Sequence, residues 1–108
     1  MEYALLICRD ESQAPLAAPE QEAFAALLER LGPRLKVNTR LRPSGTATTV
    51  KVRDGGLVIA DGPFAETKEQ VAGVLVVECE DLDEAVELAA QIPVARLGAI
   101  EVRPVWPL

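Results

Sequence analysis

The stretch Asp61-Gly62-Pro63-Phe64-Ala65-Glu66-Thr67-Lys68-Glu69 lies between two segments that have the composition of β-strands. An aspartate that begins a turn can accept a hydrogen bond from a backbone N–H two residues later. Gly62 permits a positive φ, Pro63 restricts its own φ, and Phe64 is expected to pin the turn to the core. We therefore predict a stiff turn at the exit of a β-hairpin.

The residues before this turn predict the hairpin itself. The segments 46–53 and 57–60 are β-branched or apolar, and Asp54-Gly55-Gly56 separates them. Asp-Gly between two such segments is a strong hairpin signal, because both turn positions need a positive φ. After the turn, residues 71–78 are almost continuously apolar, as in a strand that is buried on both faces.

The remaining segments complete an alternation of strands and helices. Strands are predicted at residues 2–9, 35–41 and 99–105, and helices at 19–31 and 81–91. Without the hairpin the order is βαββαβ. We therefore predict an α+β fold, a ferredoxin-like βαββαβ sandwich with an inserted β-hairpin, which occupies residues 1–108 as a single domain.

Periodicity also predicts which side chains face the core. Along the edge strand at 35–41, one face should hold Leu35, Val37, Thr39 and Leu41. The second helix should begin with a capping box between Asp81 and Glu84. Its buried stripe is predicted to contain Leu82, Ala85, Val86, Ala89 and Ile92.

The burial pattern predicts a homodimer. The strands at 2–9 and 71–78 should lie side by side at the centre of the sheet, and each is apolar on both faces. Both helices of a βαββαβ fold cover the same face, so a second copy of the sheet is expected on the open face. The two central strands run antiparallel in this plan. Cys8 and Cys79 should therefore lie at opposite ends of the sheet, too far apart for an intrachain disulfide.

Composition excludes several classes of function. The net charge is −6 and the pI is about 4.6, with no cluster of basic residues, so neither a nucleic-acid nor a membrane partner is expected. The chain has no histidine and two separated cysteines, which leaves no metal site and implies no cofactor. No targeting or transmembrane segment is recognised, so a cytoplasmic location is expected.

The stretch 61–69 also holds the candidate functional residues. A rigid turn could hold Asp61 at the mouth of a cleft, where exclusion of water suits a carboxyl group to acid–base chemistry. Lys68 could bind an anionic ligand, with Glu66 nearby. Phe64 and, from the strand before, Thr48 and Arg53 are further candidates for substrate binding. Each has a structural alternative: a stiff hairpin exit, a solvated loop, a strand-forming threonine or a surface charge.

The quoted stretch, together with residues 47–50, 81–85, 92–96 and 100–105, resembles the DGPF domain, a branch of the YciI-like (YCII-related) proteins. The resemblance covers essentially the whole chain and implies a ferredoxin-like fold in a dimeric α/β barrel. In the wider group a His–Asp pair in the inter-subunit cleft is the suspected catalytic feature, and some relatives process small cyclic or chlorinated compounds. Some DGPF proteins occur beside extracytoplasmic-function sigma factors. Since this chain has no histidine, only Asp61 remains of such a pair.

Two hypotheses follow. The first is a homodimer with a small-molecule cleft on each protomer, which acts weakly by proton transfer through Asp61. Lys68 or a nearby arginine would hold an anionic substrate. The alternative is a non-catalytic module that binds a metabolite or a protein, such as a sigma factor.

Overall fold

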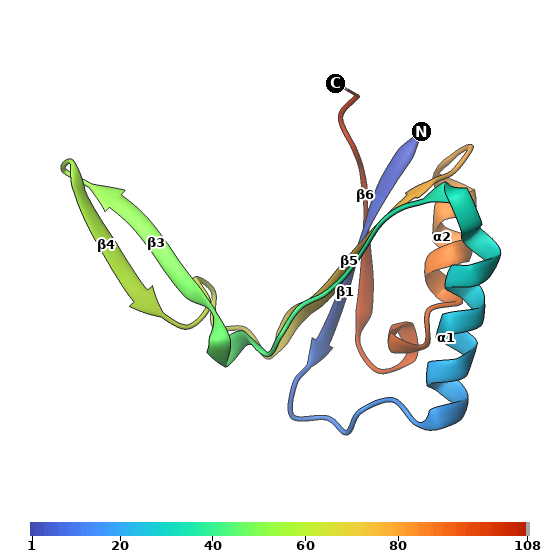
Figure 1. Cartoon of the computed structure of the whole chain (residues 1–108), viewed down its shortest axis with the longest axis horizontal. Coiled ribbons are helices and arrows are strands. Elements are labelled where there is room, and N and C mark those ends of the chain that lie inside the picture. Colours follow the sequence, from blue (N-terminus) through green and yellow to red (C-terminus); the bar gives the residue numbers. More distant parts are fainter. Residues whose placement is uncertain (108) are drawn as a thin grey trace.

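The structure is a computed structural model that describes residues 1–107 as a sheet, a layer of two helices and a projecting arm (Figure 1). The helices are α1 (Ala18–Leu31) and α2 (Leu82–Ala90), and short 3-10 helices span Gly32–Arg34, Ser44–Thr46 and Pro93–Arg96. The strands are β1 (Glu2–Asp10), β2 (Leu35–Arg40), β3 (Thr48–Arg53), β4 (Gly56–Asp61), β5 (Glu69–Glu78) and β6 (Ala99–Pro104). No helix within the described residues has the length and apolar character that a bilayer crossing requires.

The four-stranded sheet has the order β2-β5-β1-β6, and every neighbouring pair is antiparallel. This order is consistent with the predicted ferredoxin-like plan and confirms an α+β fold. The central pair is β1 and β5, as predicted, and its register places Glu2 opposite Glu78 and Asp10 opposite Glu69. Cys8 pairs with Val71 near one end, whereas the Cys79 N–H donates to the Met1 carbonyl at the other. Both cysteines are free thiols, as the antiparallel arrangement required.

The core lies between the sheet and the two helices. Its fully buried large side chains are Leu5 of β1, Leu75 and Val77 of β5, and Ile92. The alternate residues of the same strands point to the other face and are only half-buried: Ala4, Leu6, Val74 and Val76. We call these four residues, together with Val37 of β2, the open face. Both helices lie on the opposite side of the sheet (Figure 1).

The edge strand β2 differs from the predicted alternation. Leu35 pairs with Val77 and Val37 with Val76, because the register shifts between them. Since Val77 and Val76 point to opposite faces, the bulge places Leu35 against the core and Val37 on the open face. The prediction that these two side chains share one face is therefore wrong.

Helix α2 buries a stripe that is shifted from the predicted one. Its buried side chains are Ala85, Leu88 and Ala89, followed by Ile92 beyond the helix end. Leu82 and Val86, which were predicted to be buried, are each about half exposed. The helix is rotated about its axis so that Ala85, Leu88 and Ala89 face the core, which leaves Leu82 and Val86 on its outer side.

The strands β3 and β4 pair with each other as a separate two-stranded sheet. The chain reverses at Asp54 and Gly55, whose φ angles of 51° and 73° suit the turn that matches strand twist. We call residues 48–61 the arm. It extends from the sheet on the side away from the helices (Figure 1). The radius of gyration is consequently 15.8 Å, whereas a compact chain of this length has about 13 Å.

Candidate functional site

The turn after β4 is fastened to the beginning of β3. Gly62 has a φ of 97°, a positive φ of the kind that a glycine permits. Its N–H donates to the Ala47 carbonyl at 2.7 Å. The Thr49 hydroxyl donates to the Gly62 carbonyl at 2.8 Å. These two hydrogen bonds fix the base of the arm and hence the position of Asp61, which precedes Gly62.

Asp61 lies directly opposite Thr48 in the arm, so the carboxylate and the hydroxyl share one face. Both side chains are exposed to solvent in the protomer. The strand pairing therefore brings together two of the predicted site residues. It does not exclude water from Asp61, and any cleft around this carboxylate has to be completed from outside the protomer.

Phe64 does not pin the turn to the core. Its side chain is 77% exposed, because the turn leaves the sheet together with the arm instead of folding back under the helices. The Lys51 ammonium lies 5.0 Å from the centre of the Phe64 ring, within the range of a cation–π contact. Lys51 follows Thr48 by three residues in β3, so this contact lies on the other side of the hairpin from Asp61.

Glu66 and Lys68 lie in an exposed segment whose backbone is held by hydrogen bonds from the Gln70 side chain. The Gln70 amide donates to the carbonyls of Ala65 and Thr67 at 3.0 and 3.1 Å. The positive charge of Lys68 also acts on the Asp10 carboxylate. The pKa of Asp10 is lowered mainly because the Ser12 hydroxyl and N–H donate to it, and the positive charge of Lys68 adds to this effect.

Arg53 occupies the far end of the arm. It pairs with Gly56, five residues along β3 from the Thr48–Asp61 pair, which corresponds to about 17 Å. Its guanidinium donates to the neighbouring Val52 carbonyl at 3.1 Å. Within one protomer the structure therefore does not bring Arg53 next to Asp61, and a shared ligand would have to span the arm.

A sequence profile of the YCII-related domain matches the chain over residues 1–108. The chain belongs to the YCII-related domain family. An uncharacterised protein of Rhizobium meliloti (strain 1021) is 34% identical over 113 residues, and the match covers 96% of this chain and 91% of the relative. The family resemblance inferred from the motif is thus confirmed. Neither match assigns an activity.

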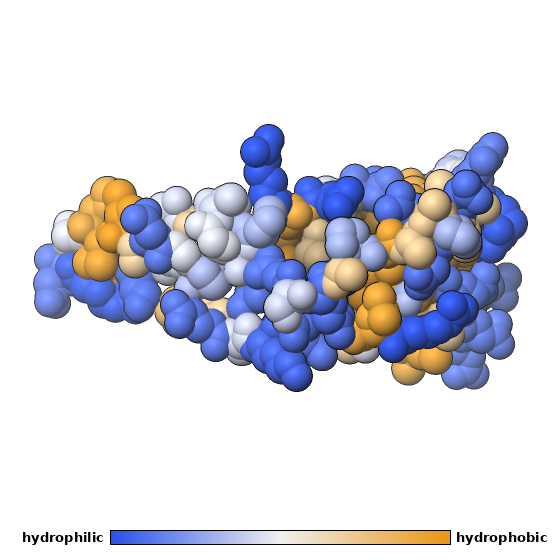
Figure 2. All heavy atoms as spheres, turned by 90° about the horizontal axis from the view of Figure 1, so that it is seen from below, coloured by the Kyte–Doolittle hydropathy of each residue, from blue (hydrophilic) through white to orange (hydrophobic). Residues whose placement is uncertain are grey.

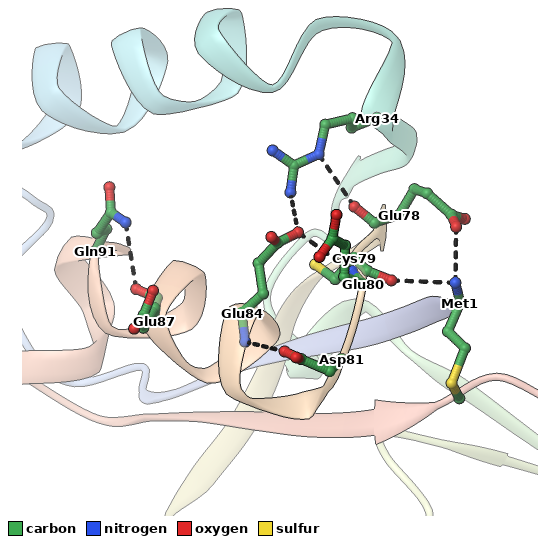
Figure 3. A network of polar contacts seen from close by, with 9 residues as sticks. All are labelled: Met1, Arg34, Glu78, Cys79, Glu80, Asp81, Glu84, Glu87 and Gln91. Carbon is green, nitrogen blue, oxygen red and sulfur yellow. Dashed lines mark hydrogen bonds and ion pairs between the residues drawn. The ribbon is translucent and has the colours of Figure 1, made fainter.

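The YCII-related domain also carries a polar cluster at the other end of the sheet (Figure 3). The Arg34 guanidinium contacts the Glu84 carboxylate at 2.6 Å and donates to the Glu78 carbonyl at 3.2 Å. Asp81 accepts from the Glu84 N–H at 2.9 Å, which confirms Asp81 as the helix cap. The Glu84 carboxylate reaches the Glu80 N–H at 3.4 Å instead of returning to residue 81, so the capping box is incomplete.

The charged groups of this cluster form ion pairs and hydrogen bonds with one another. The Met1 ammonium donates to the Glu78 carboxylate at 2.7 Å, and this hydrogen bond raises the pKa of the amino group and lowers the pKa of Glu78. Burial raises the pKa of the Cys79 thiol, while Arg34 acts in the opposite direction. Exposed ion pairs of this kind contribute little to stability. The cluster joins the 3-10 helix Gly32–Arg34, α2 and the sheet, and its contacts are structural.

Two residues near the turn were not singled out from the sequence of this YCII-related chain: Lys51 and Gln70. Strand alternation places Lys51 on the same face of β3 as Thr49, but the contacts of these two side chains with Phe64 and Gly62 depend on how the turn folds. Gln70 gives no sequence signal beyond its place before a buried strand. Within residues 1–107, no three histidine, cysteine or acidic side chains come together as metal ligands would.

Proposed function

We propose that the protein is a homodimer, in the form of a dimeric α/β barrel, with a small-molecule cleft at the base of each arm. The observation that carries the proposal is the open face, an apolar sheet surface without a covering helix. Two such faces packed against each other would bury both. On this proposal the arm is an insertion into the ferredoxin-like fold.

A second copy would also supply the missing walls of the site. Asp61 and Thr48 share one face of the arm and are exposed in the protomer. Removing water from this face would suit Asp61 to weak acid–base chemistry. Lys68 is the nearest cation in the sequence to the turn, and it would attract an anionic ligand. Glu66, Phe64 and Arg53 remain candidate contacts.

Ligand binding can be tested with the chain alone. A library of small carboxylates and other small anions is screened by two-dimensional NMR, and the amide shifts of residues 48–70 are followed. We expect the hits to cluster at Thr48, Asp61 and the turn. Hits that cluster on another surface, or that bind equally to Asp61→Asn, would remove Asp61 from the site. Asp54→Asn is the matched control, since Asp54 is an exposed aspartate at the other end of the same arm.

The dimer has a separate test. Light scattering should give twice the protomer mass of 11.6 kDa. Val76→Lys places a charge on the open face and should dissociate the dimer. Val86→Lys makes the same substitution on the exposed side of α2 and should leave the dimer intact. A wild-type monomer at micromolar concentration would refute the proposal.

The second candidate is a non-catalytic module that binds a metabolite or a regulatory protein such as a sigma factor. The absence of histidine supports this candidate, because histidine is the side chain best suited to proton transfer near neutral pH. Asp61→Asn separates the two functions. Normal ligand binding by this variant, with no loss of any turnover seen for the wild type, would leave the binding module as the function.

A further inference from the structure

The arm has one face that is apolar and exposed. Val50 pairs with Ile59 and Val52 with Leu57, so these four side chains lie on the same face. We call them the arm face. Each is 59–66% exposed, and Figure 2 shows hydrophobic atoms gathered at the end of the arm above a strip of hydrophilic atoms. A two-stranded hairpin is marginally stable by itself in water, so this face is expected to pack against something.

The protomer exposes more surface than a monomer of its size. Its accessible surface is 7572 Å², whereas a folded monomer of 11.6 kDa has about 5,800 Å². The excess is roughly 1,700 Å², about twice the area of roughly 800 Å² that one partner contributes to a standard interface. An excess of this size fits the large interface of a permanent homodimer.

We propose that the arm face packs against a second copy of this chain, so that two protomers exchange arms across a twofold axis. The inference rests on the proposed homodimer. The arm extends on the same side of the sheet as the open face (Figure 1), so one neighbouring protomer can contact both surfaces. A twofold contact also covers both arms at once, without requiring any further protein.

The test compares two lysine substitutions in neighbouring residues of β4. Ile59→Lys charges the arm face, whereas Val58→Lys charges the opposite face, where Val58 pairs with Lys51. Both residues are exposed in the protomer, so neither substitution disrupts a protomer core. We expect Ile59→Lys to raise the dimer dissociation constant at least about a hundredfold. The reason is that a twofold dimer contains the substituted residue in both protomers and so loses the apolar contact at two places. Val58→Lys should dimerise like the wild type. Sedimentation equilibrium measures both constants.

A second measurement on the wild-type chain keeps the inference independent of variant folding. Isotope-labelled and unlabelled chains are mixed, and contacts between subunits are recorded by isotope-filtered NMR. We expect inter-subunit contacts from the methyl groups of Val50, Leu57 and Ile59. If Val76→Lys dissociates the dimer but Ile59→Lys does not, and the arm gives no inter-subunit contact, the homodimer stands and the arm exchange is wrong. A monomeric wild-type chain overturns both.

Discussion

Replacing Gly62 with alanine should loosen the arm at its base. Gly62 has a φ of 97°, in a region that residues with a Cβ rarely adopt. A Cβ at residue 62 would meet no heavy atom within 4 Å. The substitution therefore introduces backbone strain without a steric clash, and its effect reports the conformation of the turn alone.

The size of the effect follows from two opposing contributions. A non-glycine residue held in such a conformation costs about 1–3 kcal/mol. Alanine also restricts the unfolded chain, which offsets about 0.4–1 kcal/mol of that cost. The net loss is therefore about 1–2 kcal/mol. The chain can relieve this strain locally by breaking the two hydrogen bonds of residue 62, to Ala47 and from Thr49.

Native-state hydrogen exchange measures this local opening. The residue-62 amide donates to the Ala47 carbonyl, and its exchange should become roughly tenfold faster for each 1.4 kcal/mol of strain. Amides in the centre of β1 and β5 should keep their exchange rates, because the core between the sheet and the helices is unchanged.

Gly45→Ala is the control for the loss of a glycine. Gly45 lies in the same connection to the arm and has no positive φ, and a Cβ at this position would also meet no heavy atom within 4 Å. The substitution should leave the exchange of the residue-62 amide unchanged. Equal protection of that amide in Gly62→Ala and the wild type would refute the argument that a turn that requires glycine positions Asp61.

Three further predictions concern the sheet, a helix end and pH. Gly73→Ala should cost about 1–3 kcal/mol in urea denaturation, because a Cβ there would lie 2.7 Å from the Thr39 carbonyl oxygen across the β2–β5 pair. Asp81→Ala should cost about 1 kcal/mol, measured in the same way, because the hydrogen bond to the Glu84 N–H is lost; Asp83→Ala, which removes only a first-turn charge, should cost less. The Ser44 hydroxyl and N–H lower the pKa of Glu11 below its usual 4.5. The Glu11 carboxylate therefore contributes its full stabilisation above pH 4.5. This stabilisation is lost as the pH falls through the lowered pKa that Glu11 has in the folded protein. Glu11→Gln should remove this part of the acid dependence, and an unchanged acid profile would contradict the role of the Ser44 contact.

Local periodicity was enough to predict most elements and their order. Strand alternation, the helix cap at Asp81 and the Asp54-Gly55 reversal all depend on residues close together in the chain, so the sequence alone carries the information. The same holds for the positive φ of Gly62. The motif also identified the YCII-related family, and it placed Asp61 and Thr48 among the candidate site residues. Their pairing across the arm then follows from the hairpin register.

Contacts between distant segments decided the rest. The bulge in β2 depends on pairing with β5, and it separates Leu35 from Val37 although their spacing predicts a common face. The stripe that α2 buries depends on how the helix is rotated against the core, and this rotation buries Leu88 while it leaves Leu82 and Val86 half exposed. The sequence alone determined a ferredoxin-like order of elements and a stiff turn. Only the tertiary structure decided that the turn and the arm leave the core, with Phe64 exposed, because that direction is set where the arm joins the sheet.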